Sequence, residues 1–152
     1  MGESALVDSG VLDAVELIKK LDENGRPPTL AAWYYYDDAD EWRLLLASPE
    51  LDQLLVKQES VAYKAVIEAL NALPRSSLAF SQLKIIGTAS PLAGSLRFLV
   101  KTSSAGIVRA HFTNMTLNGL FIKEVIILRV TPNPSLKRIA NGGIAALTYL
   151  KR

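Results

Sequence analysis

Residues 30–50, LAAWYYYDDADEWRLLLASPE, decide the fold because they place two apolar runs on either side of an acidic turn. Residues 37–40, DDAD, form a loop of a length common in hairpins, and aspartate favours turns by bonding nearby backbone. The sequence therefore predicts a β-hairpin in which Tyr36 pairs with Glu41. Because side chains alternate along a strand, one face becomes core. That face pairs Tyr35 with Trp42, Trp33 with Leu44, and Ala31 with Leu46.

The other face of this hairpin is amphipathic. It places Tyr36 opposite Glu41 and Tyr34 opposite Arg43, which brings phenols next to a carboxylate and a guanidinium. We expect this face to meet solvent, a ligand or a partner, and Tyr34, Tyr36 and Arg43 are candidate ligand-binding residues. The acidic turn lacks the twelve-residue ligand spacing and the glycine of an EF-hand loop, so no metal site is predicted there.

The composition predicts one soluble domain. A chain of 152 residues can bury roughly two thirds of its unfolded surface without disulfides or metal. The absence of cysteine and the single histidine exclude thiolate and multi-histidine metal sites, and no cofactor motif is present. The N-terminal residues lack the basic and apolar regions of a signal peptide, and no apolar run is long enough for a bilayer. We expect a cytoplasmic protein without membrane association.

Charge is distributed unevenly along the chain. Residues 1–60 carry 13 acidic and 5 basic side chains, whereas residues 61–152 carry 12 basic and 2 acidic ones. A basic half can bind an anion, and nucleic-acid binding is one alternative function. Its charge would come from Lys84, Arg97, Lys101, Arg109, Lys123 and Arg129. Neutralisation between the two halves within one fold is the ordinary explanation, since no basic run exceeds two residues.

The segments around the first hairpin have helical spacing. A helix is predicted to begin after Asp8 or Ser9 and to end at Asn24-Gly25, and a second one covers residues 59–73. Between them, residues 51–58 predict only a short turn. Residues 78–88 predict a third strand. After Ser90-Pro91, the spacing up to Val100 favours a helix, with a strand as the alternative.

Residues 106–130 predict a second hairpin around Asn118-Gly119, a sequence that favours a two-residue type I′ turn. Leu117 would then pair with Leu120, and the alternation places four polar residues on one face of the hairpin. These residues, candidates for a ligand site, are Arg109, His111, Thr113 and Glu124. A small enzyme could use His111 with Glu124 as general base and Arg109 to hold an anion, but cross-strand charge pairing explains the same residues.

The last 22 residues differ in composition from the rest. We predict one domain over residues 1–130 and a tail over residues 131–152 that docks on the domain or on a partner subunit, with a homodimer as the expected assembly. Residues 131–141, TPNPSLKRIAN, resemble the ends of proteins encoded by mobile integron gene cassettes. The stretches WYYYDDADEWRLLLASPE and NGLFIKEVIILRV are similar to uncharacterised bacterial proteins of mobile elements. The resemblance implies an accessory protein and supplies no catalytic residues.

These patterns together predict an α+β fold. We expect one mostly antiparallel sheet of about five strands, made of two hairpins and one strand, with the helices packed on one face. The expected function is a non-enzymatic binding module for a small molecule or a protein, acting as a homo-oligomer. No cofactor is expected.

Overall fold

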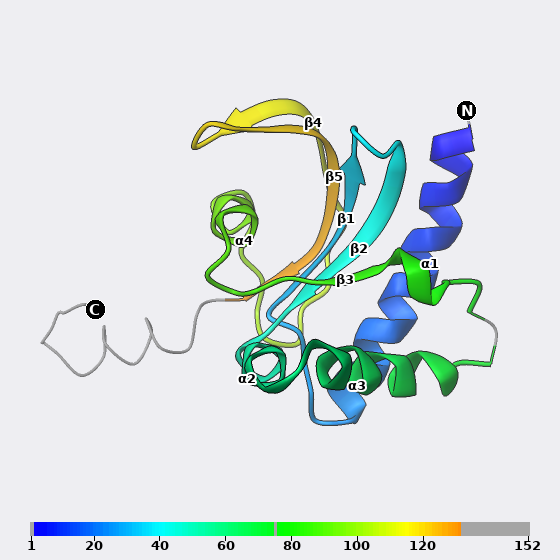
Figure 1. The fold of residues 1–152 in the computed structure, drawn as a ribbon. Helices are drawn as coiled ribbons and strands as arrows, with labels where there is room; N and C mark the ends of the chain where they lie inside the picture. Colours follow the sequence, from blue (N-terminus) through cyan, green and yellow to red (C-terminus); the bar gives the residue numbers. More distant parts are fainter. Residues whose placement is uncertain (1, 75, 132–152) are drawn as a thin grey trace, which may run out of the picture.

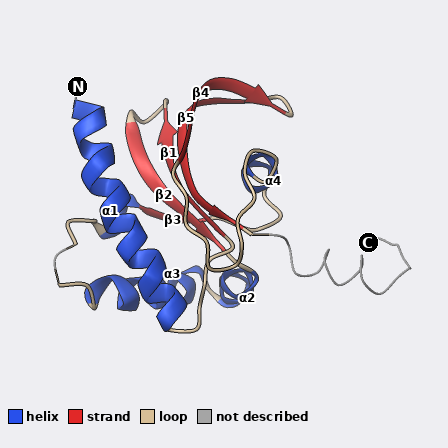
Figure 2. Ribbon diagram, turned by 180° about the vertical axis from the view of Figure 1, so that it is seen from behind, coloured by secondary structure: helices blue, strands red, loops and turns tan. Residues whose placement is uncertain are grey.

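A five-stranded sheet forms the centre of the molecule, with helices on both of its faces (Figures 1 and 2). The computed structural model describes residues 2–74 and 76–131. The elements in chain order are α1 (Gly2–Glu23), β1 (Leu30–Tyr36), β2 (Glu41–Ala47), α2 (Pro49–Lys57), α3 (Glu59–Asn71), the 3-10 helix η1 (Phe80–Gln82), β3 (Leu83–Ile85), α4 (Pro91–Leu96), β4 (Ala110–Leu117) and β5 (Leu120–Val130). The strand order is β3-β2-β1-β5-β4, and only the β2–β3 pair is parallel. The predicted α+β class and mostly antiparallel sheet are confirmed.

The first hairpin has the predicted register. β1 and β2 pair from Leu30 with Ala47 to Tyr36 with Glu41. The face that carries Trp33 and Leu44 is buried in one hydrophobic core. Asp40 closes the turn with a positive φ of 53°, and its carboxylate accepts a hydrogen bond from the Tyr35 hydroxyl. Aspartate is one of the few residues that tolerate this backbone region.

The middle of the chain differs from the prediction in three places. Residues 51–58, predicted as a short turn, belong largely to α2, whose Ser48 N-cap accepts a hydrogen bond from the Leu51 backbone N–H at 3.0 Å. The predicted strand 78–88 shrinks to β3, because η1 occupies residues 80–82. The helix after Ser90 ends at Leu96, and a turn follows it, so neither a long helix nor a strand reaches Val100.

The helices divide unequally between the two faces of the sheet. The core on one face includes buried residues of α1, α2 and α3, as the prediction of helices on one face requires. Its helix–sheet contact is close at Gly10, whose carbonyl accepts a hydrogen bond from Trp33 Nε1 at 2.9 Å. α4 departs from the prediction: its Ala93 and Leu96 belong to the core on the opposite face. Figure 1 shows α4 beneath the curved β4–β5 hairpin.

The second hairpin also pairs as predicted around Asn118-Gly119, with Leu117 opposite Leu120. The predicted separation of its faces is wrong, because Asn114 has a positive φ of 49° and interrupts the ladder. Met115 and Ile122 on the turn side of Asn114 therefore pack in the same core as Phe112 and Val125 on the other side. An irregular residue of this kind bends a strand. Arg109 lies just before β4 and does not form the predicted pair with Leu128.

Arg129 on β5 is fully buried, so it cannot supply surface charge to an anionic partner as the sequence suggested. Its two terminal nitrogens each donate to a carboxylate oxygen of Asp22 on α1, both at 2.8 Å. Its Nε donates to the Gly106 carbonyl at 2.9 Å, and Nη1 also reaches the Pro28 carbonyl at 3.3 Å. Arg129 therefore connects β5 to α1 and to the two loops that contain Pro28 and Gly106.

The predicted tail, apart from Thr131, lies outside the described residues, and so does its docking. The homodimer stays a prediction as well. Across residues 2–74 and 76–131, none of the helices combines the length and apolar character needed to cross a membrane.

Candidate functional site

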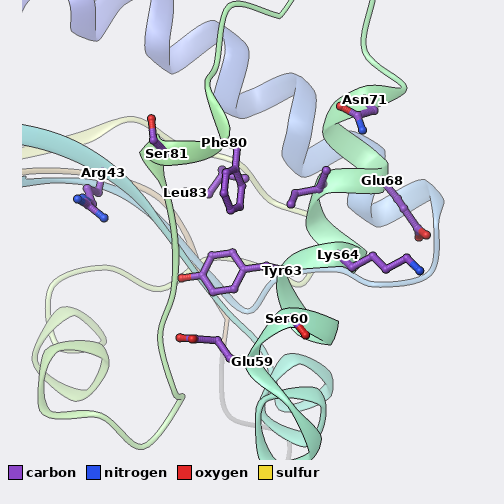
Figure 3. Close-up of a pocket in the computed structure, with 11 residues that line it drawn as sticks. Arg43, Glu59, Ser60, Tyr63, Lys64, Glu68, Asn71, Phe80, Ser81 and Leu83 are labelled. Carbon is purple, nitrogen blue, oxygen red and sulfur yellow. The ribbon is translucent and has the colours of Figure 1, made fainter.

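A hollow lies between α3 and the segment η1–β3, at one edge of the sheet (Figure 3). Its volume is about 810 Å³, within the range of small-molecule sites. Apolar and polar side chains share the lining. They are Arg43, Glu59, Ser60, Tyr63, Lys64, Ile67, Glu68, Asn71, Phe80, Ser81 and Leu83. We call this hollow the α3 groove.

The groove exists because β3 is short. β3 pairs with Leu44–Leu46 only, so the outer edge of β2 beside Arg43 has no strand partner there. η1 turns the chain away from the sheet and leaves the Phe80 side chain 56% exposed. The Tyr63 hydroxyl, from α3, accepts a hydrogen bond from the Ile85 backbone N–H at 3.0 Å. Tyr63 thus satisfies a donor that an edge strand would otherwise present to water.

Two aromatic rings form the apolar wall of the groove. The Tyr63 and Phe80 rings meet edge to face, with centroids 6.1 Å apart and planes at 85°. Figure 3 shows these rings at the centre, with Arg43 on one side and the Lys64 and Glu68 side chains extending on the other. Aromatic pairs of this geometry stabilise each other and leave their remaining surface for a ligand.

The charged groups around the rings are balanced in sign. The lining contains two basic side chains, Arg43 and Lys64, and two acidic ones, Glu59 and Glu68. The Arg43 Nε donates to the Glu41 carboxylate at 2.7 Å, and its Nη2 also donates to that carboxylate. The Arg43 Nη1 has no hydrogen-bond partner within residues 2–74 and 76–131, and a guanidinium has five N–H donors in all. Arg43 can therefore bind a further acceptor at the groove mouth.

Tyr34 and Tyr36, predicted together with Arg43, lie on the same face of the sheet as Arg43, since Tyr34 pairs with Arg43 and Tyr36 with Glu41, and both tyrosines pack in or against the core that includes α4. Their rings meet edge to face at 4.8 Å, and Lys84 Nζ is 6.0 Å from the Tyr36 ring. Burial raises the pKa of the Tyr34 phenol above 10.0. Burial also raises the pKa of Tyr36, Tyr34 and Tyr63 add to the rise, and Arg43 opposes it. Tyr34 is buried, so the predicted trio contributes only Arg43 to the lining.

The second predicted cluster lies towards the opposite edge of the sheet, on β4 and β5. His111 Nε2 is 2.6 Å from Glu124 Oε2, and Arg109 pairs with Asp8 at 2.8 Å. Thr113 lies opposite Glu124. The His111 side chain is 51% exposed, and cross-strand pairing accounts for its contact with Glu124. The strand order separates this cluster from Arg43, so the two predicted groups do not form one site.

The acidic turn between β1 and β2 has protein partners for two of its carboxylates. Asp40 accepts from Tyr35, and Asp37 lies 3.3 Å from Lys123 Nζ. Within the described part of the chain, no three histidine or acidic side chains cluster in a way that could hold a metal ion.

Comparison with protein-family models, with curated proteins and with solved structures finds no match to this chain. The site therefore rests on its own geometry.

Sequence reasoning did not identify Tyr63 and Phe80 as site residues. Tyr63 fell inside the predicted helix over residues 59–73, and Phe80 fell inside the predicted strand over residues 78–88. The sequence held no clear signal at Phe80, because Leu78 stands two residues before it in SSLAFSQ and would pack beside it on the same face of a strand.

Proposed function

We propose that this protein is a binding module for a small amphipathic molecule and that the α3 groove is its site. The observation that carries the proposal is the aromatic pair of the exposed Phe80 and the partly buried Tyr63 beside the guanidinium of Arg43. Ligand sites combine an apolar wall with a few placed polar groups.

The chemistry of the lining defines the ligand class. A planar or alicyclic ring would pack against Phe80 and Tyr63, in the surface that the two rings leave open. A carboxylate or another strong acceptor on the same molecule would accept a charge-assisted bond from Arg43. The balanced charges of the lining favour a ligand with at most one net charge.

A titration with three probes that share one ring tests this. 3-Phenylpropionate, 3-phenylpropanol and 3-phenylpropylamine differ only in the end group, and two-dimensional NMR reports both affinity and location. We expect the carboxylate to bind most tightly and to shift the amides of α3 and η1. Phe80→Ala should weaken all three probes. Arg43→Gln should weaken the carboxylate about tenfold, the loss expected for one hydrogen bond to a charged group, and should leave the alcohol unchanged.

Phe98→Ala is the matched control, because it removes another exposed phenylalanine that does not line the groove. If it weakened the probes as much as Phe80→Ala does, binding would be nonspecific. Equal affinity for all three end groups would contradict the role of Arg43. Shifts confined to residues outside the groove would reject the groove as the site.

A further inference from the structure

A second surface feature lies directly after α4. A hollow of about 510 Å³ is lined by Gly94, Arg97, Phe98 and Lys101. The Phe98 side chain is 76% exposed, although its neighbour Leu96 is fully buried. We call these four residues the Phe98 patch. The Phe98 ring is exposed to water beside the cations Arg97 and Lys101, so it does not contribute to the hydrophobic core.

The backbone holds Phe98 outward. Leu96 is anchored in the core beneath α4, and the turn after it is closed by the bonds of Phe98 N–H to Ser95 at 3.2 Å and of Leu99 N–H to Leu96 at 3.1 Å. A Cβ atom added at Gly94 would meet nothing within 4 Å, so the space beside the ring is open. The turn therefore directs the Phe98 ring outward, next to an open hollow.

The charge around the patch is positive. Lys101 is exposed, and Arg97 is held by the bond of its Nη2 to the Thr88 carbonyl at 2.7 Å. The neighbouring carboxylate is Asp52, which accepts hydrogen bonds from the N–H and the hydroxyl of Thr88. Lys84 adds a cation on the same face of the sheet, since it pairs with Leu45 of the α4-side core.

We propose that the Phe98 patch binds single-stranded nucleic acid. One base stacks on the Phe98 ring above Gly94, and the flanking phosphates contact Lys101 and Arg97. Stacking on an aromatic ring combined with cations along the backbone is the general mode of single-strand binding. An acidic peptide would use the cations and would have no need of an exposed ring. This proposal is independent of the α3 groove.

Fluorescence anisotropy on the full chain tests it, with labelled 20-nucleotide single-stranded DNA and RNA of random sequence. We expect salt-dependent binding, tighter at about 50 mM than at about 200 mM salt, because phosphate contacts release counterions. Phe98→Ala should weaken binding at least about fivefold, the lower end for one stacked base, and Phe98→Tyr should restore it. Lys101→Gln should lower the slope of log affinity against log salt by about 0.7.

The controls separate this patch from general charge and from the groove. Phe80→Ala and Lys64→Gln remove the same residue types on the other side of the sheet and should leave affinity unchanged. Polyglutamate at matched charge should compete poorly. Absence of binding at low salt, wild-type affinity in Phe98→Ala, or equal competition by polyglutamate would each overturn the proposal, the last by identifying a surface for acidic proteins. Thermal unfolding of each variant verifies that it is folded.

Discussion

The exposure of the two side chains in the Arg129–Asp22 pair predicts which of the two substitutions lowers the free energy of unfolding more. The Arg129 side chain is 0% exposed, whereas that of Asp22 is 29% exposed. Asp22→Asn leaves a guanidinium without a counter-charge in a place that water does not reach, which typically lowers the free energy of unfolding by about 3–5 kcal/mol. Arg129→Met leaves a carboxylate that water can solvate. It also removes the bonds to the Gly106 and Pro28 carbonyls, at about 1 kcal/mol each.

We therefore expect Asp22→Asn to be the more destabilising change, by about 1 kcal/mol or more, and the double variant to resemble Arg129→Met alone. Urea unfolding followed by circular dichroism measures these differences, provided that the m-value is unchanged. Arg26→Gln is the matched control, because the Arg26–Glu50 pair is 39% and 46% exposed and should contribute less than about 1 kcal/mol. If Arg129→Met were more destabilising than Asp22→Asn, the argument from solvation would be refuted.

Three further predictions use matched substitutions in the same protein. Gly94→Ala should stabilise by about 0.5–1 kcal/mol through helix propensity, because its added Cβ meets nothing within 4 Å. Gly10→Ala gains the same propensity in α1, but its Cβ would lie 3.3 Å from the ring of Trp33, which is buried and bonded to the Gly10 carbonyl and so cannot move away. We therefore expect a net loss of stability at Gly10, and chemical unfolding distinguishes the two signs. Trp33→Phe should lower the unfolding free energy by about 1–3 kcal/mol more than Trp42→Phe does. Trp33 Nε1 donates a hydrogen bond to the Gly10 carbonyl, whereas the buried Trp42 Nε1 has no partner in the described residues. Equal losses in the two variants would contradict this. The raised pKa of Tyr36, due first to burial and then to Tyr34, means that its stabilisation is complete below pH 10 and is lost as pH rises through the higher folded pKa. Unfolding free energy should therefore fall less steeply above pH 10 in Tyr36→Phe than in the wild type, and parallel profiles would exclude a contribution from this phenol.

Local patterns were enough to predict both hairpins. The acidic turn at residues 37–40 and the Asn118-Gly119 turn fix the register within a few residues, so the pairing of Tyr36 with Glu41 and of Leu117 with Leu120 follows from turn chemistry alone. The face of the second hairpin could not be predicted beyond Asn114. A single positive φ there exchanges the two faces, and asparagine permits that conformation without requiring it.

Contacts between distant segments were not accessible from the sequence. Arg129 reads as one more cation in a basic half, and only the approach of Asp22, 107 residues away, makes it a buried anchor. The α3 groove has the same origin, because Arg43, Tyr63 and Phe80 come from three elements that meet where β3 begins. Among the predicted site residues, Arg43 lines the groove, and the His111 cluster lies at the other edge of the sheet.

The placement of phenylalanine connects the two proposed surfaces. Both cores are built mainly from leucine, isoleucine, valine and alanine, with tryptophan and tyrosine, while three of the four phenylalanines are more than half exposed. Phenylalanine is normally among the most buried residues, and of the four only Phe112 packs against a core, so the exposure of the other three requires a reason outside the core. Phe80 and Phe98 each line a hollow with a guanidinium, and the hollows differ in charge. The groove is balanced in sign, which suits a compact ligand, and the patch is cationic, which suits a polyanion. We therefore propose that the same ring type serves two recognition tasks and that its charged neighbours distinguish them.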